Sequence, residues 1–187
     1  MKEIVSIAGS PSRTAKSAHV LRYIQMSLAS KGWQSENILV RDLPAEDLLH
    51  ARLDSAAIQE AHALIDGAKA IIVATPVYKA AYSGILKAFL DLLPQDALKG
   101  KIVLPLATGG SQAHLLAIDY ALKPVLGALG ATHILRGVYL LDTYLQIDAE
   151  GNLLIEAALE QRLQEALQEL DTHLQAQIAP LAVRQSS

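Results

Sequence analysis

Residues 4–17 read IVSIAGSPSRTAKS. The mostly apolar run Ile4–Ala8 has the composition of a buried strand, and it ends at Gly9. A polar stretch with four hydroxyl side chains follows, and from Ala15 to Ser30 the apolar residues recur at helical spacing. The stretch therefore predicts a strand, a polar loop at its carboxyl end and a helix.

The same alternation continues through the rest of the chain. Further strands are expected at Ile38–Val40, Ala70–Thr75, Ile102–Ala107 and Ile134–Leu141, and further helices at Ala56–Gly67, Ser83–Leu93, Ala113–Leu129 and Leu153–Gln177. Continuous apolar strands joined by helices are typical of a parallel sheet covered on both faces. These five units predict a flavodoxin-like, doubly wound α/β fold with five parallel strands in the order 2-1-3-4-5. We expect a single domain over residues 1–178 and a loose tail over 179–187.

Composition and charge exclude several classes of protein. The chain has 187 residues, of which 51% are hydrophobic, and a formal net charge of -3. No basic field for nucleic acid and no cationic amphipathic or membrane-spanning stretch is evident. The absence of cysteine excludes disulfides and thiolate chemistry, and the six histidines lack metal-ligand spacing, so we expect no metal site. The start Met-Lys-Glu resembles no secretory signal, and a cytoplasmic protein is expected.

In such a sheet, ligands bind at the carboxyl ends of the strands, where the strand order reverses. The first loop there is GSPSRTAKS. Gly9 permits a sharp turn, Ser10, Ser12 and Ser17 offer hydroxyl groups, Arg13 offers a guanidinium, and the following helix offers free N–H groups. These features describe a phosphate cradle, although a turn followed by a helix cap would use similar residues.

The first loop matches neither of the common nucleotide motifs. It has no Gly-Lys-Ser/Thr of a Walker loop and no Gly-x-Gly-x-x-Gly of a Rossmann fingerprint. A low-molecular-weight phosphatase would need a cysteine in this loop, and a receiver domain would need aspartates at these strand ends. The remaining interpretation is a loop that binds phosphate without attacking it, as a nucleotide cofactor requires.

The second and third loops read PVYKAAYSG and TGGSQ. Pro76 is expected to end the third strand and Ser83 to cap the next helix. Pro76, Val77, Tyr78 and Tyr82 could pack on a flat, hydrogen-bonding ring such as isoalloxazine, or the tyrosines could pack over the sheet edge. Gly109 and Gly110 permit close backbone approach to a ligand, but a tight turn would use the same residues.

Long blocks of the chain resemble the NADPH-dependent FMN reductase family. The blocks are AGSP at residues 8–11, EDLLHAR at 46–52, IIVATPVYKAAYSGILKAFLDLLP at 71–94 and LPLATGGSQAHLLAIDYALKPVLGALGA at 104–131. Within the family they are most similar to the flavin reductases of two-component alkanesulfonate monooxygenase systems. The resemblance implies FMN and NADPH as cofactors and direct hydride transfer between them, with no catalytic acid or base from the protein.

The same resemblance assigns roles to particular residues. It implies that the FMN phosphate is bound by Ser10, Ser12, Arg13 and Ser17, and the isoalloxazine by Pro76, Val77, Tyr78, Gly109, Gly110 and Ser111. It also implies a partner monooxygenase that receives reduced FMN for alkanesulfonate desulfonation and sulfur acquisition. The preference for NADPH over NADH rests on the resemblance alone.

The segment Ala113–Leu129 has apolar residues around more of its circumference than one buried face requires. We expect it to form a homodimer or homotetramer interface together with Ile85, Phe89 and Leu93, and to bend at Lys123–Pro124. The resemblance implies that Tyr120 lies near the flavin across this interface and favours flavin release. An ordinary kinked interface helix is the alternative.

Three classes of function remain open. The first is a reductase that uses FMN as a dissociable substrate and delivers reduced FMN to a monooxygenase. The second is a quinone or azo reductase that keeps FMN bound. The third, a flavodoxin-type electron carrier, is disfavoured because such carriers are usually strongly acidic, whereas this chain is nearly neutral.

Overall fold

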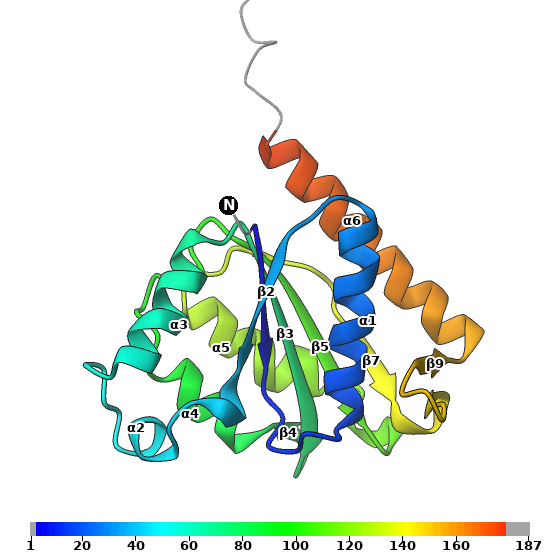
Figure 1. Cartoon of the computed structure of the whole chain (residues 1–187), viewed down its shortest axis with the longest axis horizontal. Coiled ribbons are helices and arrows are strands. Elements are labelled where there is room, and N and C mark those ends of the chain that lie inside the picture. Colours follow the sequence, from blue (N-terminus) through cyan, green and yellow to red (C-terminus); the bar gives the residue numbers. More distant parts are fainter. Residues whose placement is uncertain (1–2, 179–187) are drawn as a thin grey trace, which may run out of the picture.

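A parallel sheet forms the centre of the computed structural model, which describes residues 3–178. Its strands are β1 (Ile4–Ala8), β2 (Ser35–Leu39), β3 (Ala70–Tyr78), β5 (Ile102–Gly109) and, at the last position, the short β6 (His133–Ile134) and β7 (Val138–Leu141). The order is β2-β1-β3-β5, with β6 and β7 both beside β5 (Figure 1). With β6 and β7 taken together as the fifth strand, the predicted parallel order 2-1-3-4-5 is confirmed.

Helices cover both faces of the sheet, as predicted (Figure 1). On one face, α1 (Lys16–Ser30) and α6 (Ala157–Ile178) bury a leucine-rich core that includes Ile24, Leu163 and Leu167. On the other face, α3 (Ala56–Gly67), α4 (Gly84–Leu90) and α5 (Lys123–Ala128) bury a second core. The short α2 (Ala45–Leu49) and a 3-10 turn, η1 (Val40–Asp42), lie in the connection from β2 to α3 and were not predicted.

The third strand does not end at Pro76, and this prediction was wrong. β3 continues to Tyr78, with Pro76 opposite Thr108 of β5, and then turns into β4 (Ala81–Tyr82) as an antiparallel hairpin. The pairing between β1 and β3 stops at Ala74. Pro76 therefore lies where β3 has a neighbour on one side, a position that tolerates the missing N–H of proline.

The fifth strand, predicted as one element from Ile134 to Leu141, is divided between β6 and β7. Gly137 separates the two with a φ of +83°, which places it in the left-handed region. A Cβ at this position would lie 2.6 Å from the Pro105 carbonyl oxygen. Close backbone packing against β5 therefore requires glycine here and interrupts the strand.

The helix predicted over Ala113–Leu129 is not a continuous α-helix. A 3-10 turn, η2 (Gln112–His114), is followed by a π-helical turn, η3 (Ile118–Leu122), and only α5 is α-helical. Pro124 has no N–H, so the Tyr120 carbonyl would lose its α-helical donor. A π-helical turn shifts the hydrogen bonding by one residue just before this proline.

Two further predictions concerning packing need correction. Phe89 is fully buried and Leu93 is 7% exposed, and both belong to the core on the α3–α5 face. They are therefore not available for a subunit interface. Ile85 is half-buried against the same core.

The last predicted helix begins four residues later than expected, at Ala157. Leu153–Ile155 forms β9, which pairs with β8 (Leu145–Ile147) after the 3-10 turn η4 (Asp142–Tyr144). The Asp148 carboxylate accepts hydrogen bonds from the N–H and side chain of Asn152 at 2.7 and 3.1 Å, and this closes the turn of the hairpin.

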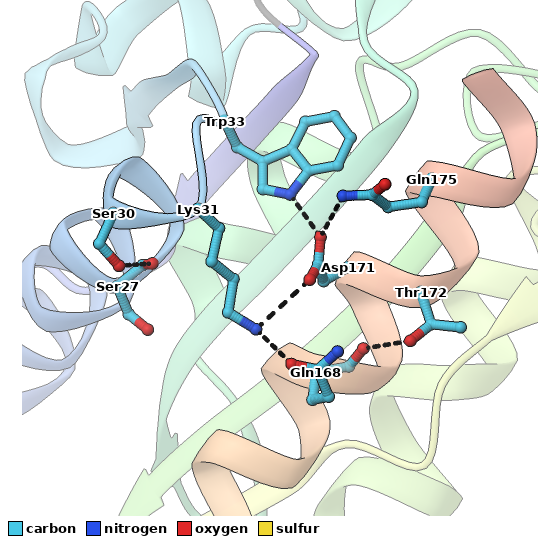
Figure 2. A network of polar contacts seen from close by, with 8 residues as sticks. All are labelled: Ser27, Ser30, Lys31, Trp33, Gln168, Asp171, Thr172 and Gln175. Carbon is cyan, nitrogen blue, oxygen red and sulfur yellow. Dashed lines mark hydrogen bonds and ion pairs between the residues drawn. The ribbon is translucent and has the colours of Figure 1, made fainter. Parts of the chain in front are cut away.

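A polar network ties the end of α1 to α6 (Figure 2). Trp33 Nε1 donates to Asp171 at 2.8 Å, and Lys31 Nζ lies 3.4 Å from the same carboxylate and 2.6 Å from Gln168. Burial alone would raise the pKa of Asp171. Hydrogen bonds from Trp33 and Gln175 and the charge of Lys31 lower this pKa by more, so the net pKa lies below its ordinary value.

Two absences hold for the part of the chain that the structure describes. Within residues 3–178, no helix is long and apolar enough to cross a membrane, and no cluster of three or more potential metal ligands occurs. The tail predicted over residues 179–187 lies outside the described residues.

Candidate functional site

Three loops meet at the carboxyl edge of the parallel sheet: residues 9–17 after β1, 76–83 at the end of β3, and 109–115 after β5. Direct contacts join the first two. The Gly9 N–H donates to the Ala74 carbonyl at 2.8 Å, and Ser83 Oγ donates to the Gly9 carbonyl. Ser83 Oγ also accepts from the Leu86 N–H and caps α4, as predicted. The ten residues predicted to bind a flavin all lie in these three loops.

The serines of the first loop hold it in a tight turn by accepting hydrogen bonds from its own backbone. Ser10 is 1% exposed, and its Oγ accepts from the Ser12 N–H at 3.2 Å. Ser12 Oγ accepts in turn from the Thr14 N–H at 3.3 Å. A Cβ on Gly9 would lie 2.7 Å from Cβ of Leu86, so glycine is required where α4 packs against this turn.

Ser17 lies in the first turn of α1 and has an unsatisfied hydroxyl group. It is 3% exposed, and its Oγ has no hydrogen-bond partner among the described residues. The N-cap residue Ala15 supplies no side-chain cap to the helix. A buried hydroxyl and uncapped N–H groups at the positive end of a helix dipole are a donor set that fits a phosphate.

A cluster of charges lies beside this loop. Arg13, whose side chain is 80% exposed, has its Nη2 3.0 Å from Asp42 Oδ1 in η1. Arg41 is largely buried and donates from Nη1 to the Ser12 carbonyl at 3.3 Å. Sequence reasoning missed Arg41 and Asp42 because they follow β2, whose loop was not considered part of the site.

Tyr78 and Tyr82 lie on the β3–β4 hairpin, which forms the second loop. Tyr78 is 49% exposed, whereas Tyr82 packs partly into the α3–α5 core, where burial raises its pKa. The tip of the hairpin consists of Lys79 and Ala80, which have φ values of +50° and +67°. A two-residue turn with both residues in the left-handed region gives a tight hairpin, and side chains make it strained.

Tyr139 of β7 packs against the third loop and forms a hydrogen bond with it. It is 5% exposed and donates from its hydroxyl to the Ser111 carbonyl at 2.7 Å. A Cβ on Gly109 would collide with the Tyr139 hydroxyl, so this glycine permits their close contact. Burial and the nearby Asp142 raise the Tyr139 pKa, and the phenol is therefore a neutral donor at ordinary pH. No sequence pattern singled out Tyr139.

A cavity of about 460 Å³ adjoins the third loop. Gln112 and Leu115 contribute to its wall from the loop, Tyr139 from β7, Glu156 from just before α6 and Arg162 from within α6. The cavity carries both an acidic and a basic side chain at its wall. It lies beside the third loop, between β7 and the beginning of α6.

The site has the features of a flavin-nucleotide protein of the flavodoxin-like class: a phosphate-type loop, an aromatic hairpin and a glycine-containing third loop at one sheet edge. The profile of the family described as NADPH-dependent FMN reductase matches residues 2–146. The chain therefore belongs to the NADPH-dependent FMN reductase family, which consists of oxidoreductases that use FMN and NADPH.

Individual relatives agree with this assignment. The chain is 48% identical over 181 residues to an FMN reductase (NADPH) of Pseudomonas putida, covering 96% of this chain and 91% of the relative. It is 47% identical to an FMN reductase (NADPH) of Escherichia coli, covering 88% and 86% of the two chains. The solved apo structure of the NADH:FMN oxidoreductase EMOB superposes with a TM-score of 0.82 at 40% identity, covering 92% and 90%.

Proposed function

We propose that the three loops bind FMN as a substrate to be reduced by NADPH. Ser10, Ser12, Arg13 and Ser17 hold the 5′-phosphate, Pro76, Val77 and Tyr78 contact one side of the isoalloxazine, and the backbone of Gly109, Gly110 and Ser111 contacts its polar edge. The observation that carries this proposal is the buried hydroxyl of Ser17, which has no partner among the described residues and lies in an uncapped helix turn.

The two nucleotides supply the chemistry, which is hydride transfer from the nicotinamide to the flavin. The protein positions the rings. Tyr139 fixes the Ser111 carbonyl, and Ser83 joins the first and second loops through Gly9. Because Tyr139 belongs to β7 and Ser83 is the N-cap of α4, these contacts attach the loops to regular elements and reduce the entropy lost when the reactants are aligned.

We further propose that reduced FMN leaves the protein and supplies a monooxygenase, in alkanesulfonate desulfonation and sulfur acquisition. The blocks at residues 71–94 and 104–131 support this, since they resemble the flavin reductases of such two-component systems. The exposed guanidinium of Arg13 also supports it, because surface-exposed charge contacts hold a ligand weakly.

The test is the rate of NADPH oxidation by the purified protein in air, titrated with FMN. We expect a rate near zero without added flavin and a hyperbolic rise as FMN is added. Protein that is yellow as purified, that reduces a quinone and that gains nothing from added FMN would instead identify a quinone or azo reductase. Failure to oxidise NADPH under any of these conditions would favour an electron carrier.

We also propose that the chain forms a homodimer or homotetramer through the segment from Leu115 to Tyr120. In this segment Leu115 is 50%, Leu116 56% and Tyr120 79% exposed, which leaves a large apolar surface uncovered. Tyr120 then lies in the interface and favours flavin release. A Tyr120→Ala variant should change the oligomer mass or tighten FMN binding, and a variant that changes neither quantity contradicts this role.

A further inference from the structure

Two guanidinium groups share one carboxylate beside the first loop. Asp42 Oδ1 lies 3.0 Å from Arg13 Nη2 and 3.8 Å from Arg41 Nε. Arg41 is anchored by its bond to the Ser12 carbonyl, and its Nε has no hydrogen-bond partner among the described residues. Within residues 3–178, this cluster therefore joins two permanent cations, Arg13 and Arg41, to one anion, Asp42.

The position of Asp42 matters because of the charge of the proposed ligand. A phosphate monoester carries between one and two negative charges at neutral pH. To bind Arg13, it must displace Asp42 or share the guanidinium with it. The side chain of Arg41 is 14% exposed, that of Asp42 38% and that of Arg13 80%, so solvent screens the Arg13–Asp42 pair strongly and the Arg41–Asp42 pair only in part. A carboxylate so placed opposes the arrival of a second anion.

We propose that Asp42 lowers the affinity of the first loop for the FMN phosphate by competing for Arg13, which keeps FMN a dissociable substrate. This inference rests on the proposed function, because it takes the flavin phosphate as the ligand of residues 9–17. In this proposal Asp42 sets the affinity for FMN, whereas the serines bind the phosphate. Arg41, which donates to the Ser12 carbonyl, stays beside the loop as a fixed cation when Arg13 moves from Asp42 to the phosphate.

The experiment measures FMN and riboflavin binding to Asp42→Asn by fluorescence titration, with NADPH absent. We expect FMN to bind about tenfold more tightly and to dissociate correspondingly more slowly, while riboflavin affinity stays unchanged because riboflavin has no phosphate. Asp42→Ser, which also removes the carboxylate, should shift FMN affinity in the same direction. Glu169→Gln is the matched control: it makes the same charge change at an exposed position of α6 and should leave both affinities unchanged.

A double-mutant cycle with Arg13→Ala separates competition for Arg13 from a general charge effect. If Asp42 acts through Arg13, Asp42→Asn should have little effect on FMN affinity in the Arg13→Ala background. An equal gain in both backgrounds would overturn the competition. Unchanged FMN binding by both Asp42 variants would also overturn it. Weaker binding would overturn it by showing that Asp42 positions Arg13 for the phosphate.

Failure of the Asp42 proposal can be distinguished from failure of the proposed function. If the wild-type protein binds and releases FMN but does not oxidise NADPH when FMN is added, the proposed function fails while the effect of Asp42 on affinity is still measured. If riboflavin and FMN gain equally in Asp42→Asn, the competition fails while FMN-dependent NADPH oxidation can still be observed.

Discussion

Replacing Ser17 with alanine should change stability and FMN affinity in opposite senses. In the flavin-free protein the buried Ser17 hydroxyl lacks a partner among the described residues, and an unsatisfied buried group costs about 1–3 kcal/mol. Alanine removes this cost and is also the better helix former. We expect the free energy of unfolding to rise by about 1 kcal/mol, which corresponds to about 2–4 °C in Tm for a chain of this size.

The same substitution removes a hydrogen bond to the charged phosphate. Such bonds contribute about 1.5–3 kcal/mol, so FMN should bind about 10- to 100-fold more weakly to Ser17→Ala. The assays are thermal unfolding without flavin and FMN titration by fluorescence. Riboflavin affinity should change little, because the lost bond is made to the phosphate.

Ser6 provides a matched control for this prediction. Ser6 is fully buried in β1, and its Oγ also has no hydrogen-bond partner within residues 3–178. Ser6→Ala should therefore raise stability in the same way but leave FMN affinity unchanged, because Ser6 precedes the loop. The reasoning is refuted if Ser17→Ala binds FMN as tightly as the wild type, or if the substitution lowers the stability of the flavin-free protein.

Three other predictions follow from single contacts. Tyr139→Phe should cost about 1–2 kcal/mol of stability and weaken FMN binding, because the Ser111 carbonyl loses its buried donor; denaturant unfolding and FMN titration measure both. Ala80→Gly should raise stability by about 0.5–1 kcal/mol, since the φ of +67° strains alanine, and a lower denaturant midpoint would contradict this. Because the pKa of Asp171 is lowered in the folded state, its stabilising effect is present above its ordinary pKa of 3.8 and is lost as pH falls through the folded value. Asp171→Asn should therefore lose less stability than the wild type in Tm measurements as the pH is lowered below 3.8, and equal losses would exclude this role.

The strands and their order could be predicted because each strand has a local signal in the sequence. Ile4–Ala8 and Ile102–Gly109 are buried on both faces and read as apolar runs, and right-handed crossovers leave few possible topologies. The division of the fifth strand depends instead on a tertiary contact. Nothing in the residues around Gly137 shows that its Cα packs against the Pro105 carbonyl, so the sequence alone reads as one continuous strand.

Helix type was harder to predict than helix position. Apolar residues do recur at helical spacing over 113–129. Pro124, however, removes a hydrogen-bond donor, and the chain forms a π-helical turn before it rather than a bent α-helix. Leu153–Ile155 was assigned to the last helix because its apolar residues continue the pattern of α6. The turn held by Asp148 and Asn152 converts them into a strand.

Topology correctly predicted that the three loops meet at one edge of the sheet, since parallel strands bring their carboxyl ends together there. Their supports were not predicted. Tyr139, Arg41 and Asp42 act through contacts with residues far away in the sequence, and a buried tyrosine or a basic residue after a strand carries no distinctive pattern.

The most direct test of the account compares FMN with riboflavin in steady-state NADPH oxidation by the wild-type protein. The two flavins share the same ring, so residues 76–83 and 109–115 should bind them alike. Only the loop from Gly9 to Ser17, with Arg41 and Asp42 beside it, can distinguish them. The account predicts a similar kcat and a KM about 100-fold higher for riboflavin, as expected when two or more charge-assisted hydrogen bonds are lost. Equal KM values for the two flavins would show that the first loop does not hold the flavin phosphate.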